Sequence, residues 1–587
     1  MKRWILKGGK ENLDKISEEF NIEKIIAKIL INRDLKYEEI DKFLYGDKND
    51  LNNPLDMKDM DIATDIIIKK IKENKKIRII GDYDQDGVSS TVILIKALRE
   101  LSQNIDYKIP NRVIDGYGIN ERLVEEAKEE GVDLIITCDN GIAAFEAVDK
   151  AKEIGLDIII SDHHDIPIFI EDKEKVYRVP KADAIVNPKQ VDCKYPFKNI
   201  CGAVVALKIC EAIYEKVGIA KEKLENLYQF AAMATICDVV DLKDENRIIV
   251  KMGLEKINNS ENIGLKALIR ETGLEDKKIG VYHLGFVLGP CINASGRLDT
   301  AGIAVELFTS EDIKLVEKDA KLLVSLNNKR KEMTEKGLKQ TIRMIEESEI
   351  KDDNILIVYN PDIHESIAGI IAGRIKEQYY KPTIVLTSSK NEGFAKGSGR
   401  SIEEYDMFSE LSRLKELFER FGGHPMAAGL TILEENIDEF RKRLNQNSKL
   451  SKQDLIEKIY IDAQMPIEGI KLNLPERLSI LEPFGKANRK PTFGDKNIKV
   501  LKIAILGQNY KIVKFSLKKG QNQVLEAIYF GDIDQILDYL KKKFSEEEVE
   551  KAMNGLDNEI YLDLIYYPNI NEFRGERNLQ IIIQDYR

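Results

Sequence analysis

Long hydrophobic runs and paired cysteines are both missing from this sequence. No apolar stretch approaches the ~20 residues that a membrane-spanning helix needs. The apolar run after the basic start "MKRWILKGG" is too short for a secretory signal peptide. Six cysteines are scattered without a CxxC pair, which argues against a zinc site or a disulfide framework. We therefore expect a cytoplasmic protein that has reduced thiols and does not contact a membrane.

Net basic charge is also missing, and histidine is scarce. The net charge of −11 argues against a protein that coats nucleic acid, because non-specific affinity for nucleic acid comes from Lys and Arg. A local basic groove remains compatible with this charge. The 587 residues include only five histidines, and two of them, His163 and His164, are adjacent. This pair is therefore a candidate for chemistry.

Short apolar runs alternate with amphipathic helical stretches in the first half of the chain. The runs lie at 77–81, 134–138, 157–161 and 182–188. This alternation predicts an α/β unit with a mostly parallel sheet that is covered on both faces. Because single cores stop growing at ~300 residues, a chain of this length should contain further domains.

The remaining regions differ in character from this unit. A helical part follows at about 200–305, and one long charged helical pattern fills 310–348. A second, smaller α/β unit begins near residue 354. β-rich runs after residue 454, with a single helical stretch at 532–544, suit a β-barrel of the OB type, which commonly binds single strands.

These patterns divide the chain into five expected parts. The expected boundaries are an N-terminal helical segment (1–55), a catalytic α/β domain (56–305), a linking helix (306–350), a second α/β domain for substrate binding (351–453) and the barrel (454–587). The first segment has charged helical patterns, and its role is open.

Acidic residues follow the predicted parallel strands directly. The three clusters are "GDYDQDG" with Asp82, Asp84 and Asp86, "CDNG" with Asp139, and "SDHHD" with Asp162, His163, His164 and Asp165. In open parallel sheets, ligands bind beyond the carboxyl ends of the strands, so the clusters should converge. Clustered carboxylates repel one another and need cations, and oxygen with imidazole suits Mn²⁺ or Mg²⁺. The alternative for any single loop is a turn former.

A fourth acidic element, "AAMATICDVVDL" (231–242), carries Asp238 and Asp241 at the end of a helix-like apolar run. Alone, either Asp could be a helix cap or a solvated turn. In order, "DYDQDG", "CDNG", "SDHHD" and "ATICDVVDL" resemble the four motifs of the DHH phosphoesterase superfamily. "IPNRVIDGYG", "LGPCINASGRL", "GSGRS", "FGGHPMAAG" and "LEPFGKANRKPTF" are similar to segments of one branch of it, the RecJ exonucleases. Departures at Gln85, Cys138 and Cys237 remove no candidate ligand.

The resemblance implies roles for the acidic and histidine residues. The metal ligands would be Asp84, Asp86, Asp139, His163 and Asp238, and the cofactor would be two Mn²⁺ (or Mg²⁺) ions. Asp82 would lie in the same loop, beside the second metal. His164 would act on the scissile phosphate or as a proton donor.

Cations should face the metals, because the substrate is a polyanion. The candidate phosphate-binding residues are Asn293, Arg297, Ser398, Arg400, His424, Arg112 and Arg374. Arg guanidinium pairs bidentately with phosphate oxygens, and the flanking glycines permit close backbone approach. For Arg112 and Arg374, a solvated surface charge is an equal alternative. His283 is expected to be structural.

The barrel offers a candidate surface for single strands. "YKIVKFSLKKG" interleaves Tyr510 and Phe515 with Lys511, Lys514, Lys518 and Lys519. Aromatic rings that stack bases, beside lysines that follow phosphates, are typical of single-strand binding. An ordinary half-buried strand with solvated lysines is an equal alternative.

The resemblance implies a single-stranded-DNA-specific exonuclease that works in DNA repair and recombination. It would degrade the strand from 5′ to 3′ and release mononucleotides. Single-stranded DNA would be the substrate, a single-strand-binding protein and a helicase would be partners, and the chain would act as a monomer. The alternatives are a phosphodiesterase of short oligonucleotides and a non-catalytic DHH scaffold. The barrel and the long helix favour a polymeric substrate, and every motif acid is present.

Overall fold

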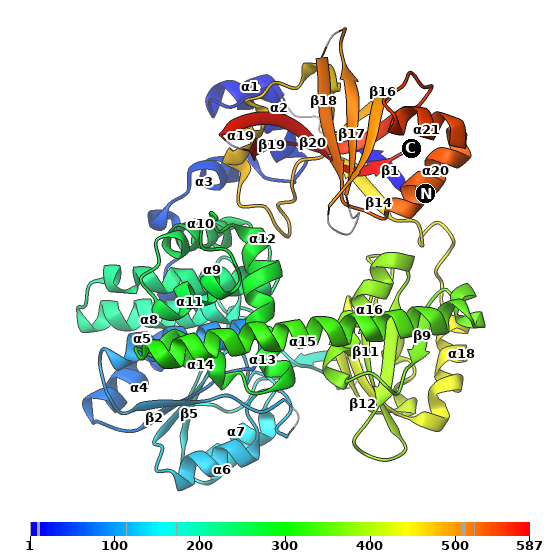
Figure 1. Cartoon of the computed structure of the whole chain (residues 1–587). Helices are drawn as coiled ribbons and strands as arrows, with labels where there is room; N and C mark the ends of the chain where they lie inside the picture. The colour runs from blue at the N-terminus through cyan, green and yellow to red at the C-terminus, as the bar shows by residue number, and fades with distance from the viewer. Residues whose placement is uncertain are drawn as a thin grey trace. The chain divides into compact units, whose positions relative to one another are not determined.

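We describe the chain from a computed structural model, which covers residues 2–8, 12–112, 114–171, 174–507, 512–521, 523–573 and 575–587. The fold has two compact units (Figure 1). The first comprises 51–240 and 248–457, and the second comprises 2–50, 241–247 and 458–587. Among the described helices, none is both long and apolar enough to cross a membrane.

The first sheet has five parallel strands in the order β3-β2-β4-β5-β8. They are β2 (Ile77–Ile80), β3 (Ile105–Lys108), β4 (Leu134–Thr137), β5 (Asp157–Ser161) and β8 (Ala184–Val186). Pairings such as Ile80 with Thr137 and Ser161 with Val186 align their carboxyl ends at one edge. The four predicted strands are confirmed. β3 was not predicted, because its half-polar sequence "IDYK" lies at the sheet margin.

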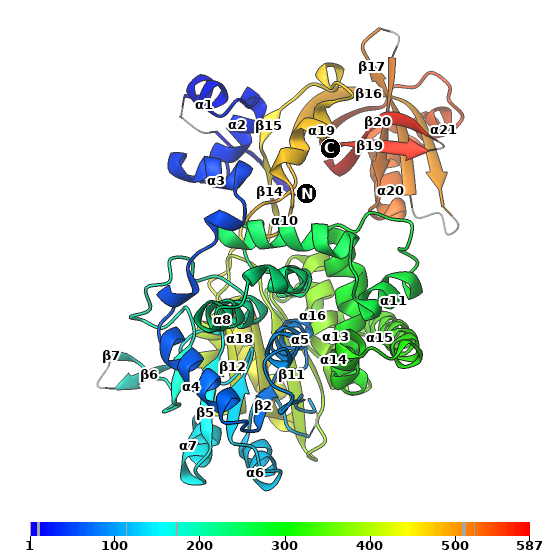
Figure 2. The same cartoon turned by 90° about the vertical axis from the view of Figure 1, so that its left-hand side faces the viewer.

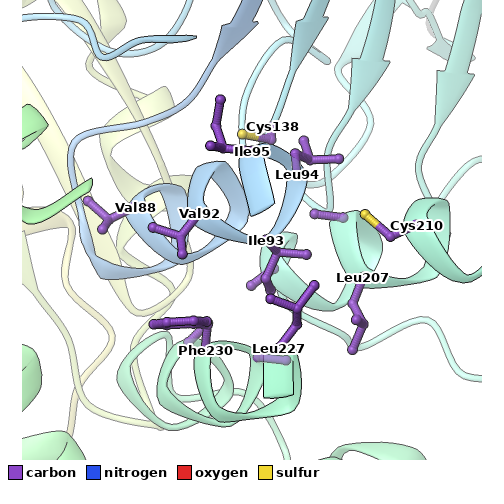
Figure 3. Packing of buried hydrophobic residues seen from close by; sticks show 14 of the residues in the cluster. Val88, Val92, Ile93, Leu94, Ile95, Cys138, Leu207, Cys210, Leu227 and Phe230 are labelled. Atoms are coloured by element: carbon purple, nitrogen blue, oxygen red, sulfur yellow. The ribbon is translucent and has the colours of Figure 1, made fainter. Parts of the chain in front are cut away.

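Alternate residues of these strands enter two separate cores, as a sheet covered on both faces requires. Ile79 and Ile136 pack with α5 (Gln85–Arg99), α8 (Gly202–Val217) and α9 (Tyr228–Cys237). Figure 3 shows Ile93 and Val92 of α5 among side chains from these helices. Ile80 and Ile135 pack on the other side with α6 (Glu121–Glu129) and α7 (Phe145–Glu153).

Helices fill the segment between the two α/β parts. They are α10 (Asp244–Asn258), α11 (Ile263–Glu271), α12 (Val281–His283), the π-helix η5 (Leu284–Leu288), α13 (Gly289–Leu298) and α14 (Gly302–Thr309). The predicted long helix is confirmed as α15 (Ile313–Glu346), which Asp312 caps. α15 runs past α13 and α14 to the second α/β part (Figure 1).

The second α/β part has a five-stranded sheet in the order β12-β13-β11-β10-β9. Its strands are β9 (Leu356–Tyr359), β10 (Thr383–Ser388), β11 (Phe394–Arg400), β12 (Phe418–His424) and β13 (Ala427–Leu433). Only the β9–β10 pair is parallel within this sheet. α16 (Glu365–Tyr379) packs through Ile367 and Ile371 against Val358 of β9.

The second unit contains a closed ring of strands. Its strands pair in the order β15 (Ala463–Gln464), β16 (Phe493–Leu506), β17 (Ile512–Lys519), β18 (Gln523–Tyr529), β20 (Glu576–Tyr586) and β19 (Tyr561–Phe573). The ring closes because β16 also pairs with β19. The helix predicted at 532–544 is confirmed as α20 (Ile533–Phe544), and a second helix that was not predicted, α21 (Glu546–Met553), follows it. They separate at Ser545, whose φ of 106° is incompatible with a helix and whose side chain caps α21.

The N-terminal residues complete this unit. They form the helices α1 (Leu13–Glu19), α2 (Lys24–Ile31) and α3 (Ile40–Tyr45). Ile26 and Leu30 of α2 and Phe43 of α3 belong to the core that holds Phe493 and Leu564. A strand was not predicted here, yet β1 (Arg3–Leu6) pairs in parallel with β14 (Lys458–Ile461). Figure 2 shows α1, α2 and α3 near α19 (Leu474–Leu478) of the same unit.

The segment "LEPFGKANRKPTF" surrounds a buried arginine of this unit. The Arg247 guanidinium donates to the carbonyls of Phe43 (2.7 Å), Leu481 (2.9 Å) and Ile480 (3.0 Å). The Asn488 amide donates to the Leu481 carbonyl at 2.8 Å. Because a buried charge is tolerated only when its donors are satisfied, this part of the motif serves the fold.

Candidate metal centre and basic pocket

The loop between β2 and α5, together with the first turn of α5, carries three acidic side chains that are held differently. Asp84 Oδ1 caps α5 by accepting from the backbone N–H groups of Asp86 (2.9 Å) and Gly87 (3.1 Å). The Asp86 carboxylate accepts from the N–H groups of Gly202 and Ala203, both at 2.7 Å. Asp86 therefore lies at the N-terminus of α8, which stabilises negative charge. Asp82 is 1% exposed.

Asp139 follows β4 in a left-handed backbone conformation, with φ 62°. Asp is among the few residues other than glycine that adopt this conformation readily. Gly202 lies against it, because a Cβ added at Gly202 would be 2.7 Å from Asp139 Cβ. The start of α8 therefore contacts both Asp86 and Asp139.

The two histidines after β5 point to different partners. His163 Nε2 lies 3.1 Å from Asp139 Oδ1, 3.6 Å from Asp86 Oδ2 and 3.9 Å from Asp238 Oδ2. His164 Nδ1 lies 2.7 Å from Asp162 Oδ1. Asp162 also accepts from the N–H groups of His163 (2.7 Å) and Ile142 (2.9 Å). Asp162 thus orients this loop.

Side chains from four segments form three overlapping groups. Within each group, the ligand atoms lie within 4.8 Å of one another. The groups are Asp82 with Asp84 and Asp139, Asp86 with His163 and Asp238, and Asp139 with His163 and His164. The structure therefore brings together all seven residues predicted for the metals and the catalytic step. Asp165 and Asp241 stand apart, because they pair with Lys189 (2.9 Å) and Lys486 (3.5 Å).

The electrostatics of this cluster fit bound cations. Burial, together with neighbouring carboxylates, raises the pKa of Asp86 to about 7 and that of Asp238 to about 8. The same causes raise the pKa values of Asp82 and Asp139 well above the usual range. The buried Oδ1 atoms of these two residues accept no hydrogen bond from the described residues. Acids buried in this way either hold protons or, when ionised, need positive ions beside them.

His163 is suited to metal binding. Burial lowers the pKa of His163 to about 3, so the ring is neutral and offers a lone pair from Nε2. Asp86, Asp139 and Asp238 surround that atom. Mn²⁺ binds well to a mixed set of carboxylate oxygens and an imidazole nitrogen, whereas Mg²⁺ prefers the oxygens.

Tyr117 joins this site, although the sequence patterns did not indicate it. Its hydroxyl donates to the Asp139 carbonyl at 3.0 Å and lies 3.2 Å from His164 Nε2. Burial alone would lower the pKa of His164, but the Asp162 carboxylate raises it to about 9. His164 is therefore a cation held between Asp162 and Tyr117. Only the segment "IPNRVIDGYG", which contains Tyr117, could have pointed to it.

A basic pocket of about 450 Å³ lies between the two α/β parts of the first unit. Its lining includes Arg112, Arg297, Ser398, Arg400, Lys396, Tyr83 and Tyr117. Arg297 donates to the Ser366 carbonyl at 2.6 Å, and Arg112 lies 4.8 Å from the centre of the Tyr83 ring. Burial, with repulsion from Arg112 and other arginines, lowers the pKa of Arg297 to about 10. Concentrated positive charge of this kind favours an anion.

Three predicted substrate residues do not line this pocket. The Asn293 side chain accepts from the Gln85 N–H at 2.8 Å and so supports the first turn of α5. Arg374 lies exposed on α16. His424 ends β12 and accepts from the Met426 N–H at 3.3 Å, two residues beyond Gly422, which does line the pocket. His283, expected to be structural, accepts from the Gly280 N–H at 3.0 Å.

The candidate single-strand surface on β17 must be corrected. Phe515 is fully buried with Val513 and Leu517, because alternate residues of β17 face the barrel core, so it cannot stack on a base. Lys514 pairs with Glu526 at 3.3 Å, and Lys519 donates to the Ile470 carbonyl at 2.6 Å. Lys518 lines a groove of about 820 Å³. Tyr510 and Lys511 lie outside the described residues.

Comparisons with known proteins agree with this architecture. Three family models match: the DHH family N-terminal domain over 76–235, the DHHA1 domain over 352–449 and the RecJ OB domain over 461–585. The chain is 34% identical to the single-stranded-DNA-specific exonuclease RecJ of Bacillus subtilis, over 99% of this chain and 70% of that protein. It is similar to the crystal structure of RecJ from Thermus thermophilus in complex with Mn²⁺ (TM-score 0.81, 23% identity, 100% and 79% coverage). A RecJ structure bound to manganese matches with TM-score 0.57 and 28% identity, over 68% of this chain and 96% of that one.

Proposed function

This chain belongs to the RecJ family of single-stranded-DNA-specific exonucleases, and we propose that its acid cluster hydrolyses single-stranded DNA from the 5′ end, one nucleotide at a time. The supporting observation is the convergence of five carboxylates with His163 and His164. Two of the buried carboxylate oxygens have no hydrogen-bond donor among the described residues. The process served is DNA repair and recombination.

The geometry supports the metal ligands that we propose. Asp84, Asp86, Asp139, His163 and Asp238 would hold two Mn²⁺ or Mg²⁺ ions, with Asp82 beside them. When bound, such ions supply a water nucleophile of lowered pKa and stabilise charge on the leaving oxygen. The chain itself supplies the fixed ligand positions, because Asp84 and Asp86 are held by the helix N-termini of α5 and α8.

The other residues act on the substrate. His164 is held by Asp162 and Tyr117, so its cationic ring can donate to a phosphate oxygen at the scissile position. Arg112, Arg297, Ser398 and Arg400 would bind a phosphate of the strand in the pocket. Tyr117 belongs to both places, because it lines the pocket and contacts His164. A phosphate bound in the pocket would place a nearby phosphodiester bond at the metals.

Direction and product size provide the test. With Mn²⁺, single-stranded DNA carrying a 5′ label should release that label at once as a mononucleotide, whereas a 3′ label should stay on long fragments. Asp139→Asn should abolish cleavage, whereas Asp165→Asn in the same motif set should retain it, since Asp165 is 82% exposed and pairs with Lys189. Activity confined to oligonucleotides of a few residues would contradict the proposal and favour a short-oligonucleotide phosphodiesterase.

The partners are part of the same proposal. A single-strand-binding protein and a helicase would supply accessible single strands to an enzyme that acts as a monomer. Co-purification with each protein, and the mass of the enzyme in solution, would test these statements separately from the activity.

A further inference from the structure

Two exposed aromatic rings lie side by side on the helical layer of the first unit. Tyr282 is 66% exposed and Phe286 is 69% exposed. Their ring centres are 5.2 Å apart and the planes differ by 24°, so the rings are stacked. Burial of such rings is favourable, so two adjacent exposed rings are a candidate surface for a ligand.

The backbone beneath these rings is unusual. Tyr282 belongs to α12, and Phe286 belongs to the π-helix η5, which continues directly into α13. Short π-helical turns are rare and frequently occur at functional sites. Residues 282 and 286 are four apart, a spacing that places side chains on one face of a helix, and their rings are nearly parallel.

The π-helix η5 packs against the end of α9, which is followed by the metal ligand Asp238. The Leu284 carbonyl of η5 accepts from Cys237 Sγ at 3.6 Å, and Asp238 is the next residue. A Cβ added at Gly289 would be 2.3 Å from Cys237 Sγ, so the end of η5 lies directly against the end of α9. Val239, which follows Asp238, is 58% exposed. The backbone that carries the two rings is thus packed against the segment that carries the metal ligand Asp238.

The segment that precedes the rings carries exposed charges of both signs, which suit a polar nucleic-acid strand better than an apolar peptide. Lys277 and Lys278 are exposed four or five residues before Tyr282, although Glu275 and Asp276 precede them. Lys277 is near enough to His283 to lower its pKa, a shift to which burial contributes most. Lysines beside exposed rings are the usual surface for unpaired bases and their phosphates.

We propose that Tyr282 and Phe286 form a stacking platform for the unpaired bases of the DNA strand whose scissile phosphate would bind at the metal centre, beside Asp238. This inference rests on the proposed function and adds a base-binding site to it. Because every base has a flat face, the platform selects unpaired bases without reading their sequence.

The first test measures binding and small-substrate cleavage. Tyr282→Ala and Phe286→Ala should each weaken binding of oligo(dT) by ~5- to 100-fold, as expected when one ring no longer stacks on a base. Both variants should cleave bis(p-nitrophenyl) phosphate, which has no base, at the wild-type rate. Tyr177→Ala removes another exposed ring of the same unit, on strand β7 (Glu174–Tyr177), and should bind like wild type.

The second test uses DNA that keeps its phosphates and lacks bases. Wild type should bind oligo(dT) more tightly than an abasic oligonucleotide of equal length, and Phe286→Ala should lose most of this difference. Phe286→Trp should restore it. Because Trp4 is the only native tryptophan, the Trp4→Phe, Phe286→Trp protein should also report base stacking by fluorescence quenching.

Failure of the platform can be distinguished from failure of the nuclease function. If wild type cleaves DNA and both alanine variants bind oligo(dT) and abasic DNA as wild type does, the platform is overturned while the nuclease function stands. If wild type cleaves neither DNA nor the small ester, the proposed function fails. Loss of oligo(dT) affinity in Tyr177→Ala equal to that in Phe286→Ala would also overturn the platform, because the effect would not be specific.

Discussion

At the scale of single residues, Tyr117 has the clearest unassigned role. Its hydroxyl contacts His164 and the Asp139 carbonyl, but it belongs to none of the three ligand groups. Tyr117→Phe should therefore lower kcat for DNA by ~10-fold while KM and Mn²⁺ affinity stay near wild type, as expected when an acting group is deprived of one hydrogen bond. A change in Mn²⁺ affinity of the same size would place Tyr117 in the metal site instead.

Asp139 should show the cost of uncompensated charge. In chelator, wild type should lose free energy of unfolding as pH rises from 5 to 8, because the folded acids, with raised pKa values, hold protons that the unfolded chain has released. Asp139→Asn removes one of these acids and tolerates the left-handed backbone, so its decrease over this range should be smaller. Melting curves at several pH values would measure this. Equal slopes for both proteins would contradict the assignment.

Arg400 should act on substrate alone. Its guanidinium donates to the Gly399 carbonyl at 2.7 Å and lines the pocket, away from the ligand groups. Arg400→Ala should weaken DNA binding by roughly tenfold or more, since a charge-assisted hydrogen bond contributes ~1.5–3 kcal/mol. Mn²⁺ titration should be unchanged. Arg374→Ala is the matched control, because Arg374 lies outside the pocket.

The site residues that the sequence predicts, and those it does not, differ in a physical way. Asp84, Asp139 and His163 closely follow buried strands, and the parallel topology forces such positions together. Tyr117 lies in a long loop, whose path depends on tertiary contacts that no periodicity records. Phe515 was misassigned because alternation shows that two faces exist, but not which face is buried.

At the scale of elements, the start of α8 leaves no room for a larger residue beside Asp139. Gly202→Ala would put a Cβ 2.7 Å from Asp139 Cβ and 2.9 Å from its Oδ1. We expect Mn²⁺ affinity to fall at least tenfold and Tm to fall by several degrees, as overpacking costs ~1–3 kcal/mol. Gly285→Ala meets only Ile236, at 3.5 Å, and should remain active. Wild-type Mn²⁺ binding by Gly202→Ala would show that α8 moves freely.

Long or repetitive elements were predictable, whereas short or interrupted ones were not. α15 is evident from 34 residues of one period, and β2, β4 and β5 from continuous apolar runs. β3 and β1 have four residues each and are stabilised as strands by the neighbouring strand. α21, which has only eight residues, was not predicted.

At the scale of the molecule, the two units should separate chemistry from long-strand binding. A fragment of residues 51–457 keeps the metal centre and the pocket, whereas a cut near 454 alone would leave the apolar residues of 2–50 without their core. We expect the fragment to cleave short oligonucleotides but to bind long single strands more weakly. Its log–log salt slope should fall by ~0.7 for each phosphate that the fragment no longer binds.

Melting of the fragment must be measured first, because unfolding would imitate a loss of activity. A folded fragment with unchanged affinity and salt slope for long DNA would show that the barrel does not bind the strand. The full-length Lys518→Gln variant offers a milder comparison, since Lys518 lines the 820 Å³ groove and its replacement should leave the fold intact.

The discontinuous second unit has a consequence for synthesis of the chain. Residues 2–50 are made before their core partners beyond residue 458, which follow about 400 residues later. At ~5–20 residues per second, Ile26, Leu30 and Phe43 wait roughly 20–80 s without their partners. Over that interval the nascent chain presents an amphipathic helical segment that cannot yet be buried. A holding chaperone should therefore bind ribosome-bound chains that end at residue 457 and release those that have reached residue 587.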